Sequence, residues 1–332
     1  MSTIVATIAR TTWKSLKWNF TTANSAAHKV DCEHIIGFPQ AKLFAFAEGL
    51  CRVRVSARDT GTVPMQHVAM AAFFPFGSGA RSLSPLFQGD HMKRHLPHFL
   101  TASIIILMLL HGPIVQPEDY HCFADTRALA ILPNALDVLS NIGFALAGVW
   151  GWLSLRKSSA TPGQAGHVLF VTALVLTAAG STYYHLQPDD FRLLWDRIPI
   201  ALACAGLLAG VHGDTSRTRH GTLHVLLLGI LAIASVFWWQ QSGDLRPYLL
   251  LQALPLVLIP AWQWIHGASG AERAGFGIAI LLYATAKAAE LHDHGVMAMT
   301  GVMSGHTLKH LLASAAAVAI VSVLARRAGT TT

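Results

Sequence analysis

Cysteine is scarce in this sequence, with four residues in 332, and no two of them form a Cys-x-x-Cys motif. The absence of that motif excludes the usual cysteine-based structural zinc sites and c-type haem attachment. Charged residues make up only 12% of the chain, and no basic stretch is interleaved with aromatic residues, as binding of single-stranded nucleic acid would require. No internal repeat of fixed period is present, which argues against repeat architectures.

What the sequence has instead is long apolar runs. Hydrophobic residues make up 53% of the chain and its mean hydropathy is +0.45, too apolar for an ordinary soluble protein of this length. A helix that spans a bilayer needs about 20 mostly apolar residues. Runs of this kind occur at 97–114, 134–155, 166–187, 193–212, 221–241, 247–265, 272–290 and 304–325. The sequence therefore predicts an all-α membrane protein, a seven-transmembrane-helix bundle with one extra N-terminal transmembrane helix.

Residues 1–91 differ from the rest, because they contain no run long enough to span a membrane and no sustained helical or strand period. Their first 30 residues hold four basic residues and no acid, which resembles an organelle transit peptide. The favoured interpretation is a mis-assigned start, because Met92-Lys-Arg-His directly before an apolar helix is an ordinary beginning for a bacterial inner-membrane protein. We therefore expect a poorly structured leader at 1–91, a transmembrane helix at 92–116 and a seven-helix domain at 117–332.

The charges between the apolar runs alternate in sign. Every second connection is basic, with Arg156 and Lys157, Arg217 and Arg219, Arg273, and Arg326 and Arg327. The remaining connections carry acids, namely Glu118, Asp119, Asp125, Asp189, Asp190, Asp244 and Asp293. The positive-inside tendency places the basic connections in the cytoplasm, which also accounts for the net charge of +7 without nucleic acid as a partner. The seven-helix bundle is then expected to start outside and to end inside.

Three histidines lie at the ends of apolar runs, where an ionisable group is costly unless it has a function. His306 and His310 are four residues apart and share one helix face, so they can bind one metal ion from the same side. His185, from another helix, would be the third ligand. Three ligands leave one tetrahedral position open for water, which is the pattern of a catalytic zinc site.

The expected topology brings further polar residues to the same depth of the membrane. Ser181 precedes His185 by one helical turn, and Asp196 lies in the outer turn of the next helix. His306 and His310 begin the last helix at the same, extracytoplasmic side. A metal site at the extracytoplasmic face of an integral membrane protein is therefore expected.

Three motifs occur in order along the chain, and they resemble those of one known family. They are Gly180-Ser181-Thr182-Tyr183-Tyr184-His185, Trp195-Asp196-Arg197-Ile198-Pro199 and Ser304-Gly305-His306-Thr307-Leu308-Lys309-His310, preceded by the helix entry Pro133–Asn141. The sequence resembles the alkaline ceramidases and their relatives in the CREST superfamily of seven-helix membrane hydrolases, over roughly residues 117–325. The resemblance implies that His185, His306 and His310 bind Zn²⁺, while Ser181 and Asp196 line the reacting centre.

The resemblance also implies an activity, the zinc-dependent hydrolysis of the amide bond of a ceramide-like membrane lipid to a fatty acid and a free amine. A zinc ion held by three neutral histidines activates water near neutral pH and polarises a carbonyl group. Asp196 would accept the proton from water and later donate it to the departing amine. Ser181 would donate a hydrogen bond to the developing oxyanion.

A calcium site is a further feature of several ceramidases, built before and at the start of the first core helix. Here the oxygen ligands available for Ca²⁺ are Asp119, Asp125, Asn134 and Asp137. Asn134 stands where the family has a Glu, and the spacing departs from the family pattern.

Each of these polar residues also has an alternative role that concerns structure and not chemistry. Histidines in membrane helices often donate hydrogen bonds between helices, which is the role expected for His167, His220, His224 and His266. Asp196 beside Arg197 could form an interfacial ion pair, and Ser181 after Gly180 a packing contact. Lys287, Glu290 and Asp293 recur at helical spacing and predict a polar network beside the metal.

Two other functions fit parts of the pattern. A seven-helix receptor or sensor of the progestin and adiponectin receptor type would use the histidines for a structural zinc, although no signalling domain is recognisable. A bis-histidine haem protein is suggested by the 18 histidines. Haem ligands would face each other across two helices in the bundle interior, whereas these three histidines are expected at one end with Ser181 and Asp196.

Overall fold

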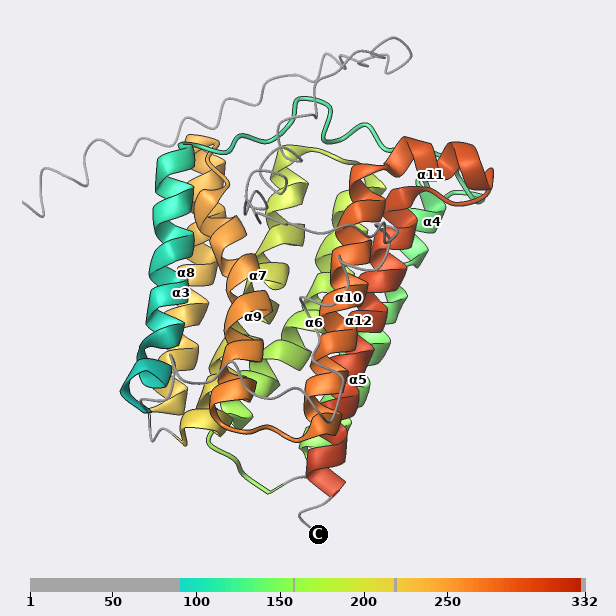
Figure 1. Cartoon of the computed structure of the whole chain (residues 1–332). Helices are drawn as coiled ribbons and strands as arrows, with labels where there is room; N and C mark the ends of the chain where they lie inside the picture. Colours follow the sequence, from blue (N-terminus) through green and yellow to red (C-terminus); the bar gives the residue numbers. More distant parts are fainter. Residues whose placement is uncertain (1–89, 158, 218–219, 330–332) are drawn as a thin grey trace, which may run out of the picture. The chain divides into compact units, whose positions relative to one another are not determined.

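The computed structural model describes residues 90–157, 159–217 and 220–329 (Figure 1). The chain divides into two compact units, residues 1–75 and 76–332, and every described residue belongs to the second. The predicted leader at 1–91 therefore lies outside the described residues, except for the two residues that begin the first described helix.

The described residues are helical where the sequence has its apolar runs, and they contain no β-strand. The helices are α3 (Asp90–His111), α4 (Ala135–Leu139), α5 (Ile142–Leu155), α6 (Gln164–Leu186), α7 (Asp190–Ser216), α8 (Gly221–Ser242), α9 (Arg246–Ile265), α10 (Gly270–Leu291), α11 (Asp293–Thr300) and α12 (Gly305–Gly329). Eight spans are long and apolar enough to cross a membrane, with α4 and α5 together forming one of them. The all-α class and the eight apolar spans are confirmed, whereas the short helix α11 was not expected.

Helix boundaries follow local capping chemistry. Asp189 precedes α7 and its side chain accepts a hydrogen bond of 2.7 Å from the backbone N–H of Arg192. Ser269 precedes α10 and forms a reciprocal capping box with Glu272. Each cap satisfies backbone N–H groups that have no partner within the first turn of a helix, so these two starts are fixed by the sequence itself.

The contact between α6 and α7 depends on glycine. A Cβ atom on Gly166 of α6 would lie 2.2 Å from the backbone nitrogen of Gly210. A Cβ atom on Gly206 of α7 would lie 2.6 Å from the backbone nitrogen of Phe170. Gly206 and Gly210 are four residues apart and share one helix face, which lets the two backbones approach each other, as is common in membrane helix pairs. This contact sets the spacing of the two helices that carry Ser181, His185 and Asp196.

The two ends of the helical unit differ in composition. One end of the helical unit holds α4 and α11, together with the end of α6 and the start of α12 (Figure 1). The end of α12 lies at the opposite end. At that second end Asp214 of α7 accepts from His167 Nε2 at 2.8 Å and from Arg327 at 3.0 Å. Arg327 also donates to Glu272 at 2.6 Å. His167 thus makes the interhelical hydrogen bond that the sequence predicted for it.

Substitution of Gly206 tests the importance of the α6–α7 contact. Gly206→Ala should reduce the free energy of unfolding by about 1–3 kcal/mol, because the added methyl group overpacks the interface. The measurement is the thermal midpoint of the purified protein in detergent. The matched control is Gly229→Ala on α8, where a Cβ atom would meet only Leu202, at 3.9 Å. Equal losses in the two variants would contradict this role for Gly206.

Candidate metal centre

Three buried imidazoles converge at one end of the helical unit. His185 comes from the last turn of α6, and His306 and His310 come from the first two turns of α12. All three are at most 4% exposed, and their ligand nitrogens lie within 4.8 Å of one another. The Nε2 atoms of His185 and His306 are 3.2 Å apart. Among the described residues this is the only group of three or more His, Cys, Asp or Glu side chains placed to hold a metal ion, and it could bind one.

The helix α4 orients His310. The Nδ1 atom of His310 lies 2.8 Å from the hydroxyl of Ser140 and 3.2 Å from the backbone carbonyl oxygen of Asp137. Since a carbonyl oxygen only accepts, Nδ1 carries the hydrogen and Nε2 keeps its lone pair. Backbone contacts of this kind are typical of histidines that bind metals through the other nitrogen.

The carboxylate of Asp137 fixes the start of α12 against α4. Its Oδ1 atom accepts a hydrogen bond of 2.5 Å from the hydroxyl of Thr307 and lies 3.5 Å from the hydroxyl of Ser304. Ser304 also caps α12 by accepting from the backbone N–H of Thr307 at 2.9 Å. Asp137 therefore fixes the position of the first two turns of α12, which carry His306 and His310.

A partly buried network of charged side chains adjoins His306. Lys309 Nζ lies 3.1 Å from His306 Nε2 and donates to Glu290 at 3.0 Å. Glu290 also accepts from Lys287 at 2.6 Å. Lys309 and a metal ion would compete for the same lone pair on Nε2 of His306. Metal binding therefore requires Lys309 to leave His306 and to keep only its ion pair with Glu290. The predicted network of Lys287 and Glu290 is present, and Lys309 links it to the histidines.

Asp196 and Ser181 lie beside each other, near the start of α7 and the end of α6. The Ser181 hydroxyl contacts the carboxyl group of Asp196, and Asp196 also lies within electrostatic reach of Lys309. The Oδ1 atom of Asp196 is buried and has no hydrogen-bond partner among the described residues. A buried carboxyl oxygen without a partner is costly in an apolar bundle, which marks Asp196 as a functional candidate.

Glycine and proline make this approach of the two helices possible. A Cβ atom on Gly180 would lie 2.2 Å from the backbone oxygen of Trp195. Pro199 has no N–H to donate to the carbonyl of Trp195 one turn earlier, so that oxygen is left for another contact. Gly180 and Pro199 thus allow Ser181 and Asp196 to meet.

The segment between α3 and α4 runs across the end of the bundle where α4 and α11 lie (Figure 1). The ring of Phe123 lies 4.3 Å from that of His306 and 5.0 Å from that of His185, measured between centroids. Asp293 anchors the segment, since one carboxylate oxygen accepts from the N–H of Ala124 at 2.8 Å and the other from the N–H of His306 at 2.7 Å. Phe123 therefore shields the three imidazoles from water.

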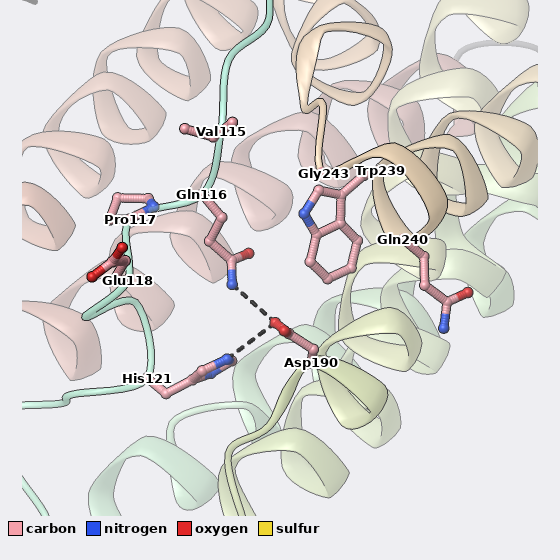
Figure 2. A pocket seen from close by; sticks show the side chains of 9 residues that line it. All are labelled: Val115, Gln116, Pro117, Glu118, His121, Asp190, Trp239, Gln240 and Gly243. Carbon is pink, nitrogen blue, oxygen red and sulfur yellow. Dashed lines mark hydrogen bonds and ion pairs between the residues drawn. The ribbon is translucent and has the colours of Figure 1, made fainter. Parts of the chain in front are cut away.

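A surface pocket of about 330 Å³ opens next to this cover. Figure 2 shows the side chains of Gln116 and His121 pointing toward Asp190, whose carboxylate lies 3.0 Å from Gln116 Nε2 and 3.1 Å from His121 Nε2. The other ring nitrogen of His121 lies 2.9 Å from the hydroxyl of Tyr184, the neighbour of His185. A chain of polar contacts thus connects the pocket to the helix turn that carries His185.

Arg197 does not pair with Asp196 as the structural interpretation had suggested. It donates to Gln116 at 2.7 Å, and its guanidinium lies 3.9 Å from the centroid of the Trp239 ring. The charge is thus stabilised by aromatic faces. Asp196 remains without an ion pair among the described residues.

The four candidate calcium ligands do not gather at one point. Asp119 is exposed, and Asp125 forms an ion pair of 2.7 Å with Arg127. The hydrogen bonds from Arg127 hold the pKa of Asp125 below its ordinary value. Asn134 donates to the backbone oxygen of His185 at 2.8 Å, and Oδ1 of Asp137 accepts from Thr307 of α12. These contacts hold the connection before α4 and the start of α12 in place.

Comparison with protein-family models, with curated proteins and with solved structures finds no match to this chain. We therefore infer the function from the positions and contacts of the three histidines, Ser181 and Asp196.

Replacing the histidines tests the metal centre. The variant with His306→Ala and His310→Ala should lose most of its bound metal, because the one remaining imidazole cannot hold an ion in competition with water. The measurement is elemental analysis of the purified protein, with a visible absorption spectrum of the same sample to separate zinc from haem. The control is His111→Ala, an exposed histidine in the last turn of α3. Full metal occupancy in the double variant would contradict the assignment.

Proposed function

We propose that this protein is a zinc-dependent intramembrane hydrolase that cleaves the amide bond of a ceramide-like membrane lipid to a fatty acid and a free amine. The single observation that carries the proposal is the convergence of three buried imidazoles, with the contact between Ser181 and Asp196 one helical turn from His185 and one oxygen of Asp196 left without a partner. In this proposal residues 117–332 form a seven-helix domain like that of the alkaline ceramidases, and residues 92–116 form an additional transmembrane helix.

The spacing of the histidines suits zinc. Two nitrogens bound to one tetrahedral zinc ion, each at 2.0–2.1 Å, lie about 3.3 Å apart. The 3.2 Å separation of the Nε2 atoms of His185 and His306 is close to that distance. Three neutral nitrogen donors are also the ligand set of many catalytic zinc sites. When bound, zinc would supply the Lewis acidity that activates water and polarises the amide carbonyl.

The chain's own groups supply the proton transfers. The unpartnered Oδ1 of Asp196 can take a proton and later return it to the nitrogen of the departing amine. The Ser181 hydroxyl, which contacts the Asp196 carboxyl group, can donate to the oxygen that becomes negative during attack. Phe123 restricts water at the histidines, which strengthens every electrostatic contact in the site.

A membrane lipid is the substrate class that suits these surroundings. The helices that carry the site are apolar along their length and expose large hydrophobic side chains such as Leu176, Leu186 and Phe191. A lipid with an amide bond near its head group can reach the end of the bundle without leaving the bilayer. A receptor with a structural zinc does not account for the buried Oδ1 atom of Asp196 that has no partner among the described residues.

The site is proposed to lie toward the extracytoplasmic face of a bacterial inner membrane. The histidines lie at the end of α6 and the start of α12. Arginines lie at the opposite end of the helical unit, namely Arg156 after α5, Arg217 after α7, Arg273 in the first turn of α10 and Arg326 in the last turn of α12. The positive-inside tendency places that basic end in the cytoplasm.

Incubation of the purified protein with a panel of lipid amides and esters tests the function, with released fatty acid as the readout. Asp196→Asn should keep the metal and lose about a hundredfold or more in turnover, because a positioned proton carrier is removed. Ser181→Ala should lower turnover less than a histidine change does.

The metal content of each variant distinguishes a proton carrier from a metal ligand. The control is Asp119→Asn, which removes an exposed carboxylate on the segment that covers the site and should leave turnover unchanged. Loss of the metal in Asp196→Asn would show that Asp196 is a ligand or an orienting group. If the metal-loaded protein releases fatty acid from no lipid amide, the proposed activity is wrong.

Reporter fusions test the orientation. A reporter enzyme that is active only in the periplasm should be active when fused after Asp190 and silent when fused after Arg219. The reverse pattern would place the metal site at the cytoplasmic face.

A further inference from the structure

A second histidine-rich site lies at the end of the helical unit opposite to the metal centre. It is a pocket of about 500 Å³ between α3, α7 and α9. Its polar rim is formed by Arg94 and His98 near the start of α3, His212 near the end of α7 and His266 at the end of α9. The proposed hydrolase makes no use of this pocket.

The rim is cationic or neutral throughout. No carboxylate is among the described residues that line the pocket. The acid nearest in sequence to His212 is Asp214, and it is already bound to His167 and Arg327. Arg94 forms no ion pair with any described residue. The guanidinium and the imidazole N–H groups are therefore available to an anion.

The histidines of the rim do not form a metal site. His212 packs its ring at 5.1 Å from that of His224 on α8 and at 5.2 Å from that of Trp262 on α9. No three of these imidazoles bring their nitrogens together, since the only such group among the described residues is His185 with His306 and His310. The sequence had assigned His224 and His266 to hydrogen bonding between helices, whereas here His224 packs against His212 and His266 lines the pocket.

The body of the pocket is apolar. Below the rim it is lined by side chains such as Ala102 and Ile105 of α3 and Leu258 and Trp262 of α9. These helices are apolar spans, so the pocket opens beside the region where acyl chains lie. A soluble anion would satisfy the rim and leave this apolar lining without a partner.

We propose that this pocket binds an anionic phospholipid, with its phosphate at Arg94, His98 and His266 and one acyl chain along Ile105, Leu258 and Trp262. A phosphate group accepts short, charge-assisted hydrogen bonds from guanidinium and imidazole groups. Basic pockets between transmembrane helices bind phosphate-bearing head groups in this way. The bound lipid joins α3 to α7 and α9, and α3 otherwise contacts the bundle mainly through α9.

Lipid retention by the full chain tests the proposal. The protein is purified into mixed micelles that contain phosphatidylglycerol or phosphatidylcholine at equal amounts, and bound lipid is counted by native mass spectrometry. The wild type should retain phosphatidylglycerol selectively. The variant with Arg94→Gln and His266→Gln should retain roughly fivefold less of it, the effect expected for losing one cationic contact near a membrane surface. Both side chains are exposed, so the fold should be unaffected.

The matched control is Arg273→Gln, an exposed arginine at the same end that does not line the pocket, and its lipid retention should equal that of the wild type. Brominated phosphatidylglycerol should quench tryptophan fluorescence, and Trp262→Phe should remove part of that quenching. Equal retention of the two lipids, or equal losses in the Arg273→Gln control, would overturn the proposal. Displacement of phosphatidylglycerol by glycerol phosphate alone would show that a soluble phosphate suffices and would also overturn it.

Discussion

Polar side chains inside a bundle of apolar helices have to find partners on neighbouring helices, because lipid and aliphatic side chains accept no hydrogen bonds. This constraint decides how α4, α6 and α12 meet. Asp137 holds Thr307, the backbone of α4 holds His310, and Asn134 holds the carbonyl of His185. The ring of His310 is therefore oriented through Nδ1, and the helix segments that carry His185 and His306 are held by contacts to their backbone and to Thr307.

The two ends of the helical unit use this constraint differently. At the end that holds the three histidines, several buried polar atoms have no hydrogen-bond partner among the described residues, and Oδ1 of Asp196 is one of them. At the other end Asp214 is saturated by His167, Arg327 and the N–H of Gly163. The first arrangement suits proton transfer and the second suits structural stability, since only an unsatisfied group can readily change its partner.

The connection between α3 and α4 contributes as much to the site as the helices do. Phe123 covers the imidazoles, Asp125 with Arg127 ties the segment to the carbonyl of Val302, and His121 joins Tyr184 to Asp190. Among the residues considered for calcium, Asp125, Asn134 and Asp137 thus act as anchors, through Arg127, the backbone of His185 and the hydroxyl of Thr307.

The sequence by itself determined the helices and the outline of the site. Run length predicted eight apolar spans, because a bilayer requires a fixed helix length, and the i, i+4 spacing of His306 and His310 predicted a shared face, because helical periodicity is local. The approach of His185 to within 3.2 Å of His306 and the positions of Lys309 and Phe123 were decided by tertiary structure alone. Distances between helices depend on glycine contacts and buried hydrogen bonds between residues of different helices, which leave no local pattern in the sequence.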